Sequence, residues 1–126
     1  MSDPRQIHWV SAKHVLRYLR GTVGYGLRYA SGCDMILQGF SDSYWVGCDA
    51  YRKSTSGCCF SLGSAVISWC SRKQTSVALS TVVVEYMAAS VATREAVWLR
   101  KLLAGLFGQN LRPIVICCDN QSCIQM

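Results

Sequence analysis

The sequence predicts an α/β domain in which a sheet packs against one long helix. Two short apolar runs, residues 35–40 and 114–118, have the length and composition of buried strands. Between them, residues 80–106 place small and apolar side chains at spacings of three and four, which is the period of a helix lying on a sheet. The 126 residues suit one small domain, and at 51% hydrophobic they can bury a core.

The charge balance favours an anionic partner. Thirteen basic and seven acidic residues give a formal net charge of +6, which suits nucleic acid, although a solvated basic surface would have the same composition. No apolar run approaches the roughly 18 to 20 residues of a membrane span, so we expect no membrane partner. The polar N-terminal residues lead into no apolar segment, so no signal peptide is visible and an intracellular location is expected.

The eight cysteines are expected to be reduced. None forms a Cys-x-x-Cys pair and no histidine lies near them in the sequence, so the spacing predicts no zinc site. Several lie inside apolar strand patterns, where a free cysteine behaves as a small hydrophobic residue. Core cysteines are therefore favoured over a disulfide framework.

The first predicted element is an amphipathic helix over residues 4–20. Asp3 is a plausible N-cap, Pro4 occupies the first helical position, and Gly21 ends the helix. One face of this helix carries mostly basic side chains at spacings of three and four: Arg5, Trp9, Lys13, Arg17 and Arg20. That face could follow a phosphate backbone, or it could simply be solvated.

Two hairpins follow the helix in the predicted order of elements. Residues 25–30 and 35–40 flank a four-residue loop that contains Gly32, and we expect them to pair. Residues 57–62 and 65–70 form the second expected hairpin, which turns at Gly63.

Basic pairs lie at the ends of the second hairpin. Arg52 and Lys53 precede it, and Arg72 and Lys73 follow it, so these four residues are the predicted contacts to nucleic acid. After the strand at 114–118, residues 120–126 begin a further helix.

Three carboxylates have positions that suit a metal site. Asp42 and Asp119 each come where a predicted strand ends, and Glu85 lies on or beside the apolar stripe of the long helix. An aspartate at a strand end often serves only to shape a turn. Three carboxylates at one sheet edge, however, would repel each other unless a divalent cation held them. Mg²⁺ suits such a site, and a pair of ions there would support phosphodiester cleavage.

Three short motifs of the chain are specific: Arg-Lys-Ser-Thr-Ser-Gly at 52–57, Cys-Asp-Asn-Gln-Ser at 118–122 and Gly-Phe-Ser-Asp at 39–42. In this order they resemble the motifs of the ribonuclease H domain of copia-type retrotransposon polyproteins. The resemblance implies a ribonuclease H-like mixed sheet with helices on its faces, and Mg²⁺-dependent hydrolysis of RNA–DNA hybrids. It also implies that residues 1–22 are the tail of a reverse-transcriptase connection and that 23–126 are a truncated ribonuclease H-like domain.

By this resemblance, Asp42, Glu85 and Asp119 match three of the family's four metal-binding, catalytic carboxylates. The fourth aspartate, with a helix and a strand, would follow the last residue of this chain. Tyr44 stands where the family has a second aspartate, and Val83 stands where a glutamate would complete a capping box. We therefore expect weak Mg²⁺ binding and a chain that is not a competent nuclease by itself.

A second class of function is suggested by Arg17-Tyr18-Leu19-Arg20, which spells Arg-x-Leu-Arg. This resembles the host-entry motif of secreted oomycete effectors, some of which are copia-derived. The resemblance implies export, entry into the nucleus or cytoplasm of a plant cell, binding to a host protein, and suppression of host cell death. The alternative is a solvated basic helix turn. A decayed transposon fragment without a selected role is the third interpretation.

Overall fold

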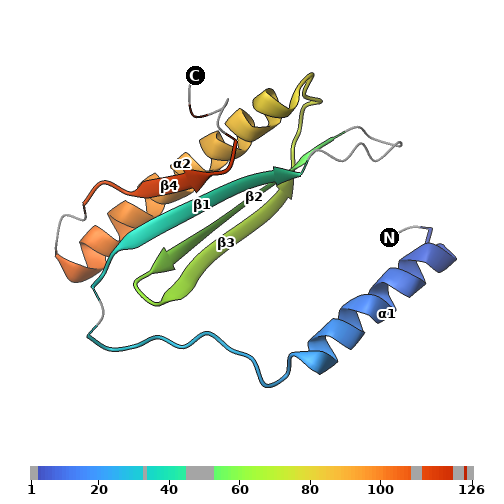
Figure 1. Ribbon diagram of the computed structural model, residues 1–126, viewed down its shortest axis with the longest axis horizontal. Coiled ribbons are helices and arrows are strands. Elements are labelled where there is room, and N and C mark those ends of the chain that lie inside the picture. Colours follow the sequence, from blue (N-terminus) through green and yellow to red (C-terminus); the bar gives the residue numbers. More distant parts are fainter. Residues whose placement is uncertain (1–2, 33, 45–52, 109–111, 121–123, 125–126) are drawn as a thin grey trace.

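The computed structural model describes residues 3–32, 34–44, 53–108, 112–120 and 124 (Figure 1). It contains a four-stranded mixed sheet and two helices, so the predicted α/β class is confirmed. The elements in chain order are α1 (Gln6–Gly21), β1 (Leu37–Tyr44), β2 (Thr55–Leu62), β3 (Ala65–Lys73), α2 (Thr81–Phe107) and β4 (Val115–Cys118).

The sheet is built around β1 and has the strand order β3-β2-β1-β4. β1 pairs antiparallel with β2 along its whole length and parallel with β4, so both of its edges are occupied. The expected β2–β3 hairpin is present. It turns at Gly63, whose φ of +58° is a left-handed conformation that glycine adopts without steric cost.

The other expected hairpin is wrong, because residues 25–30 form no strand. This segment instead runs beside the β2–β3 turn, where the Tyr29 hydroxyl donates to the Val66 carbonyl at 2.7 Å and the Ala30 amide donates to Ser64 Oγ at 3.2 Å. The physical reason is that β1 already pairs on both sides, so it offers no edge to a further strand. Tyr25 remains 83% exposed, so the segment buries little of this aromatic side chain in the conformation it adopts.

α2 lies along one face of the sheet and packs on β1, β2 and β4 (Figure 1). Its small side chains allow close approach, and the shared core contains Leu37, Cys58, Phe60, Ala92, Ala96, Leu99 and Leu103. Most residues of the predicted apolar stripe lie on the buried face of α2. The structure differs from the prediction at Val84, which is buried, and at Leu106, which lies near the end of the helix and is exposed.

The ends of α2 follow from capping. Ser80 is the N-cap, and its Oγ accepts from the Val83 amide at 3.3 Å, so this half of a capping box survives without a glutamate at position 83. The helix continues through Gly105 and ends at Gly108, whose φ of +64° makes the left-handed cap.

α1 stands apart from the sheet, joined to it by an extended segment (Figure 1). It begins at Gln6 rather than Pro4, because Arg5 is the N-cap and its amide donates to His8 Nδ1 at 3.0 Å. None of its residues is buried, and it packs on none of the other elements that the structure describes. Its proposed assignment to a separate connection therefore stays a prediction.

Two further expectations concern the ends of the chain and the membrane. The helix predicted over residues 120–126 falls mostly outside the described residues; Asn120 is not helical and Ile124 is. Neither α1 nor α2 combines the length and the hydropathy that crossing a bilayer requires, as far as the described residues go.

Candidate metal centre

Asp42 lies within β1 rather than at its end, because the ladder to β2 continues through Tyr44. Side chains alternate along a strand, and Leu37, Gly39 and Ser41 are the buried positions, on the face that α2 covers. Asp42 therefore projects from the opposite face, and it is exposed. The prediction that the strand ends before Asp42 was wrong, because the strand continues to Tyr44, although Ser41 is its last buried residue.

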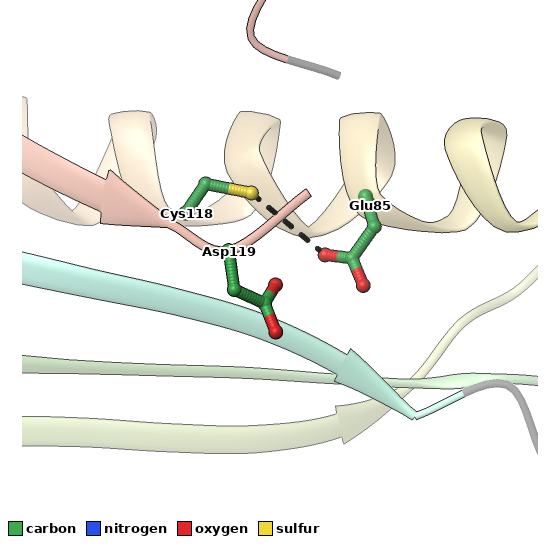
Figure 2. Close-up of side chains that lie close together, drawn as sticks. All are labelled: Glu85, Cys118 and Asp119. Carbon is green, nitrogen blue, oxygen red and sulfur yellow. Dashed lines mark hydrogen bonds between the residues drawn. The ribbon is translucent and has the colours of Figure 1, made fainter. Parts of the chain in front are cut away.

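Glu85 and Asp119 come from different elements and meet near the end of β4 (Figure 2). Glu85 lies just after the first turn of α2 and is 8% exposed, as its position beside the apolar stripe predicted. Asp119 directly follows β4 and is exposed.

Cys118, the last residue of β4, joins them. Its thiol donates to Glu85 Oε2 at 4.0 Å, and the ligand atoms of Glu85, Cys118 and Asp119 all lie within 4.8 Å of one another. The structure thus brings together two of the three predicted carboxylates and adds a thiol.

Asp42 is close to this group without being part of it. A shallow hollow of about 290 Å³ is lined by Phe40, Ser41, Asp42, Cys117, Cys118 and Asp119. Asp42 and Asp119 thus line the same hollow, which lies beside the paired strands β1 and β4. Asp42 does not belong to the group of three residues whose ligand atoms lie within 4.8 Å of one another.

The residues at this edge fit a divalent cation. Glu85 is a buried carboxylate, and it forms no ion pair in the part of the chain that the structure describes. An uncompensated buried charge is costly, and a cation would offset it. In addition, Ser41 Oγ is buried without a hydrogen-bond partner, and Ser41 lines the hollow. Such carboxylate oxygens are ligands that Mg²⁺ accepts, and a bound cation would polarise a phosphate oxygen there.

Cys118 was not predicted as a site residue. The sequence places Cys117 and Cys118 side by side, and both matched the expectation of small apolar strand residues. The pairing of Ser41 with Cys118 decides which thiol lies between the sheet and α2. The one signal in the sequence was the position of Cys118 directly before a strand-end aspartate.

The predicted basic residues lie at a different edge. Arg52 falls outside the described residues, and half-buried Lys53 precedes β2. Arg72 and Lys73 end β3 and line a groove of about 560 Å³ between that strand and α2, to which Tyr86 and Arg94 of α2 contribute. Because β3 and β4 are opposite edges of the sheet, this basic groove and the carboxylate group flank the first half of α2 from two sides. Sequence reasoning missed Arg94.

The Arg17-Tyr18-Leu19-Arg20 tetrapeptide forms the last turn of α1. All four residues are exposed, and the Tyr18 carbonyl accepts from Thr22 Oγ1 at 3.0 Å. The motif is thus accessible and helical.

The strand order, the parallel β1–β4 pair and the long helix on one face are consistent with a ribonuclease H-like α/β domain. No protein-family model and no solved structure matches the chain. Among curated proteins, it is 50% identical over 98 residues to the secreted RxLR effector protein 161 of Plasmopara viticola, covering 78% of this chain and 69% of that protein.

Two transposon proteins match over a longer stretch. The Pol polyprotein of transposon TNT 1-94 from Nicotiana tabacum is 40% identical over all 126 residues, which are 9% of that protein. The Pol polyprotein of transposon RE2 from Arabidopsis thaliana is 38% identical over 95% of this chain and 8% of its own length. The chain belongs to the copia-type retrotransposon Pol family, and it is also similar in sequence to the effector of P. viticola.

Proposed function

We propose that this transposon-derived chain binds RNA–DNA hybrids with the help of a divalent cation and does not cleave them by itself. The observation that carries the proposal is the arrangement of the carboxylates. Glu85 and Asp119 are close enough to share one cation, and Asp42 lines the same hollow as Asp119 from the neighbouring strand.

Binding would rest on the positive surface. The net charge is +6, and the groove between β3 and α2 is lined by two arginines, Arg72 and Arg94, and by the aromatic residue Tyr86. Cations in a groove contact phosphates without reading sequence, so binding should weaken steeply with salt. The Pol polyproteins similar to this chain make a nucleic acid the partner to test first.

Cleavage demands more than binding. Two-cation hydrolysis requires carboxylates that hold both ions about 4 Å apart, on either side of the scissile phosphate. Only Glu85, Cys118 and Asp119 form a tight ligand group within the described residues, and one of these ligands is a thiol. A single cation held there would anchor a phosphate and leave the attacking water without its own ion.

The test combines binding and cleavage on one labelled RNA–DNA hybrid. We expect anisotropy to show salt-dependent binding that Arg72→Ala and Arg94→Ala weaken, each reducing the slope of log affinity against log salt by about 0.9. Arg100→Ala is the matched control, because Arg100 is an exposed arginine of α2 that does not line the groove. With Mg²⁺ and folded protein we expect no cleavage. Cleavage that Asp42→Asn abolishes would overturn the proposal and establish a nuclease.

A second candidate function is supported by the similarity to the P. viticola effector and by the exposed Arg17–Arg20 turn. In this alternative the chain is secreted, enters plant cells, binds a host protein in the nucleus or cytoplasm and suppresses cell death. A reporter fusion should then enter plant cells, and Arg17→Ala with Leu19→Ala should abolish entry, whereas Lys13→Ala should not. Entry that is unchanged in the double variant would remove the role of the motif.

A further inference from the structure

We propose that Glu85, Cys118 and Asp119 form a site for a thiophilic divalent cation of the Zn²⁺ class, held through the Cys118 thiolate in preference to Mg²⁺. This inference deepens the proposed function, because it uses the same carboxylates and specifies the ion that they select. It rests on three separate observations: the ligand geometry, the orientation of Cys118, and an unpartnered hydroxyl beside it.

The ligand geometry comes close to that of a tetrahedral site. With zinc–sulfur and zinc–oxygen bonds of about 2.3 and 2.1 Å, sulfur and oxygen ligands lie about 3.6 Å apart. Cys118 Sγ and Glu85 Oε2 are 4.0 Å apart, and all three ligand atoms lie within 4.8 Å. Side-chain rotations can close that difference, since Asp119 is exposed and its carboxylate is not held by a described hydrogen bond.

The orientation of Cys118 directs its thiol toward the carboxylates. Cys118 pairs with Ser41, which is buried on the α2 side of β1, and Figure 2 shows its sulfur directed at Glu85. The adjacent Cys117 pairs with Phe40, on the other face, and its sulfur accepts from Gln38 Nε2 at 3.5 Å. Two neighbouring thiols thus have different surroundings, and only one of them faces the ligand group.

The unpartnered hydroxyl belongs to Ser41. Its side chain is buried, its Oγ has no hydrogen-bond partner, and it lines the hollow that Cys118 and Asp119 also line. A buried hydroxyl without a partner costs free energy. A water molecule in the fourth position of the cation, or the cation itself, would give that hydroxyl a partner.

The chemistry of the donors determines the selectivity. Two carboxylate oxygens alone would suit Mg²⁺, but a thiolate favours Zn²⁺ and Cd²⁺ and contributes little to a hard cation. On binding, the Cys118 thiol releases its proton to solvent and its sulfur becomes a ligand, so affinity should rise with pH. Three protein ligands leave an open position for a water molecule or a phosphate oxygen.

The test is a titration of the full chain with Cd²⁺ in a reducing buffer, followed by the ultraviolet thiolate-to-metal absorption band. We expect Cys117→Ser to retain the wild-type band and Cys118→Ser to lose the part that saturates at one equivalent. Removing a direct ligand should weaken Cd²⁺ binding by more than the roughly 10- to 100-fold that loss of an outer-shell partner costs. Glu85→Gln, which keeps both thiols, should shift the same titration to higher Cd²⁺ even if Cys118→Ser folds poorly.

Two further results separate this inference from the proposed function. Equal bands in Cys118→Ser and Cys117→Ser would overturn the thiophilic site, whatever Mg²⁺ does. A Cys118-dependent band in a chain that shows no cation-dependent binding of RNA–DNA hybrid would support the site while contradicting the proposed function. Mg²⁺ should stabilise wild type and Cys118→Ser equally, because the thiol is not a ligand of a hard cation. That result would support the assignment of the Cys118 thiol as a ligand of the softer ion.

Discussion

Gly39 of β1 and Phe60 of β2 are directly paired across the sheet, and the missing side chain of one makes room for the ring of the other. A Cβ built on Gly39 would lie 2.5 Å from Cε1 of Phe60, and Phe60 is 0% exposed in the centre of the core. The buried ring would therefore have to shift to admit a methyl group at this position. Gly39 precedes Asp42 by three residues, so this contact also fixes the strand that carries the exposed carboxylate.

Gly39→Ala should destabilise the protein. The added methyl group overlaps the Phe60 ring, and overpacking of this kind costs about 1 to 3 kcal/mol. Urea unfolding measures the loss as a lower midpoint. Gly57→Ala is the matched control on the paired strand, because its Cβ would come no closer than 3.8 Å to the Asp42 carbonyl oxygen. We expect that control to change stability by less than about 0.5 kcal/mol. Equal losses in both variants would contradict the steric explanation.

Phe60→Ala should cost far more than Phe40→Ala. Phe60 is fully buried beneath α2, and removing such a ring leaves a cavity worth about 3 to 5 kcal/mol. Phe40 is adjacent to the residue paired with Phe60, but it points to the uncovered face and is 43% exposed, so its truncation should cost about 1 kcal/mol. Free energies of unfolding from urea titrations make the comparison. Similar values would mean that something covers the open face in solution.

Glu85→Gln should stabilise the protein when divalent cations are chelated. The substitution keeps the shape of a buried side chain and removes its charge from the neighbourhood of Asp119, which should gain about 1 kcal/mol. With saturating cation, wild type should instead be more stable than Glu85→Gln, because only wild type retains the full set of ligands. Thermal unfolding with chelator and with cation tests both halves. The control is Asp34→Asn in an exposed loop, which should respond in neither condition.

Cys58 should make stability depend on alkaline pH. Burial, and then the neighbouring Cys70, raises the pKa of the Cys58 thiol above its ordinary value of 9.0. The folded state therefore keeps the proton more tightly than the unfolded state does. The contribution of the protonated Cys58 thiol to the free energy of unfolding is fully present below about pH 9, and it is lost as the pH rises through the raised pKa.

The measurement for Cys58 is the free energy of unfolding between pH 7 and pH 10 in reducing buffer. Wild type should lose more stability above pH 9 than Cys58→Ala does. The variant starts from a lower free energy of unfolding, because it lacks the buried thiol. Parallel pH profiles for the two proteins would show that the thiol does not titrate with folding.

Much of the fold was predictable because its signals are local. The helical period of residues 80–106, the alternation and turn glycine of the β2–β3 hairpin, and the apolar run at β4 each depend on residues near one another in sequence. The burial of Glu85 followed in the same way from its place on a helical stripe. Short motifs, Arg-Lys-Ser-Thr-Ser-Gly above all, are contiguous in the chain and therefore indicate the family without any knowledge of the tertiary contacts.

What the sequence by itself determined is therefore the class of the fold, most of its elements, and the family. The tertiary structure alone decided which edges of β1 were occupied, and hence that residues 25–30 form no strand and that Asp42 lies within one. It also decided which of two adjacent thiols lies beside Glu85, because a shift of one residue in the β1–β4 register would have exchanged Cys117 and Cys118. Strand pairing joins residues far apart in the chain, and the spacing within either strand does not specify their register.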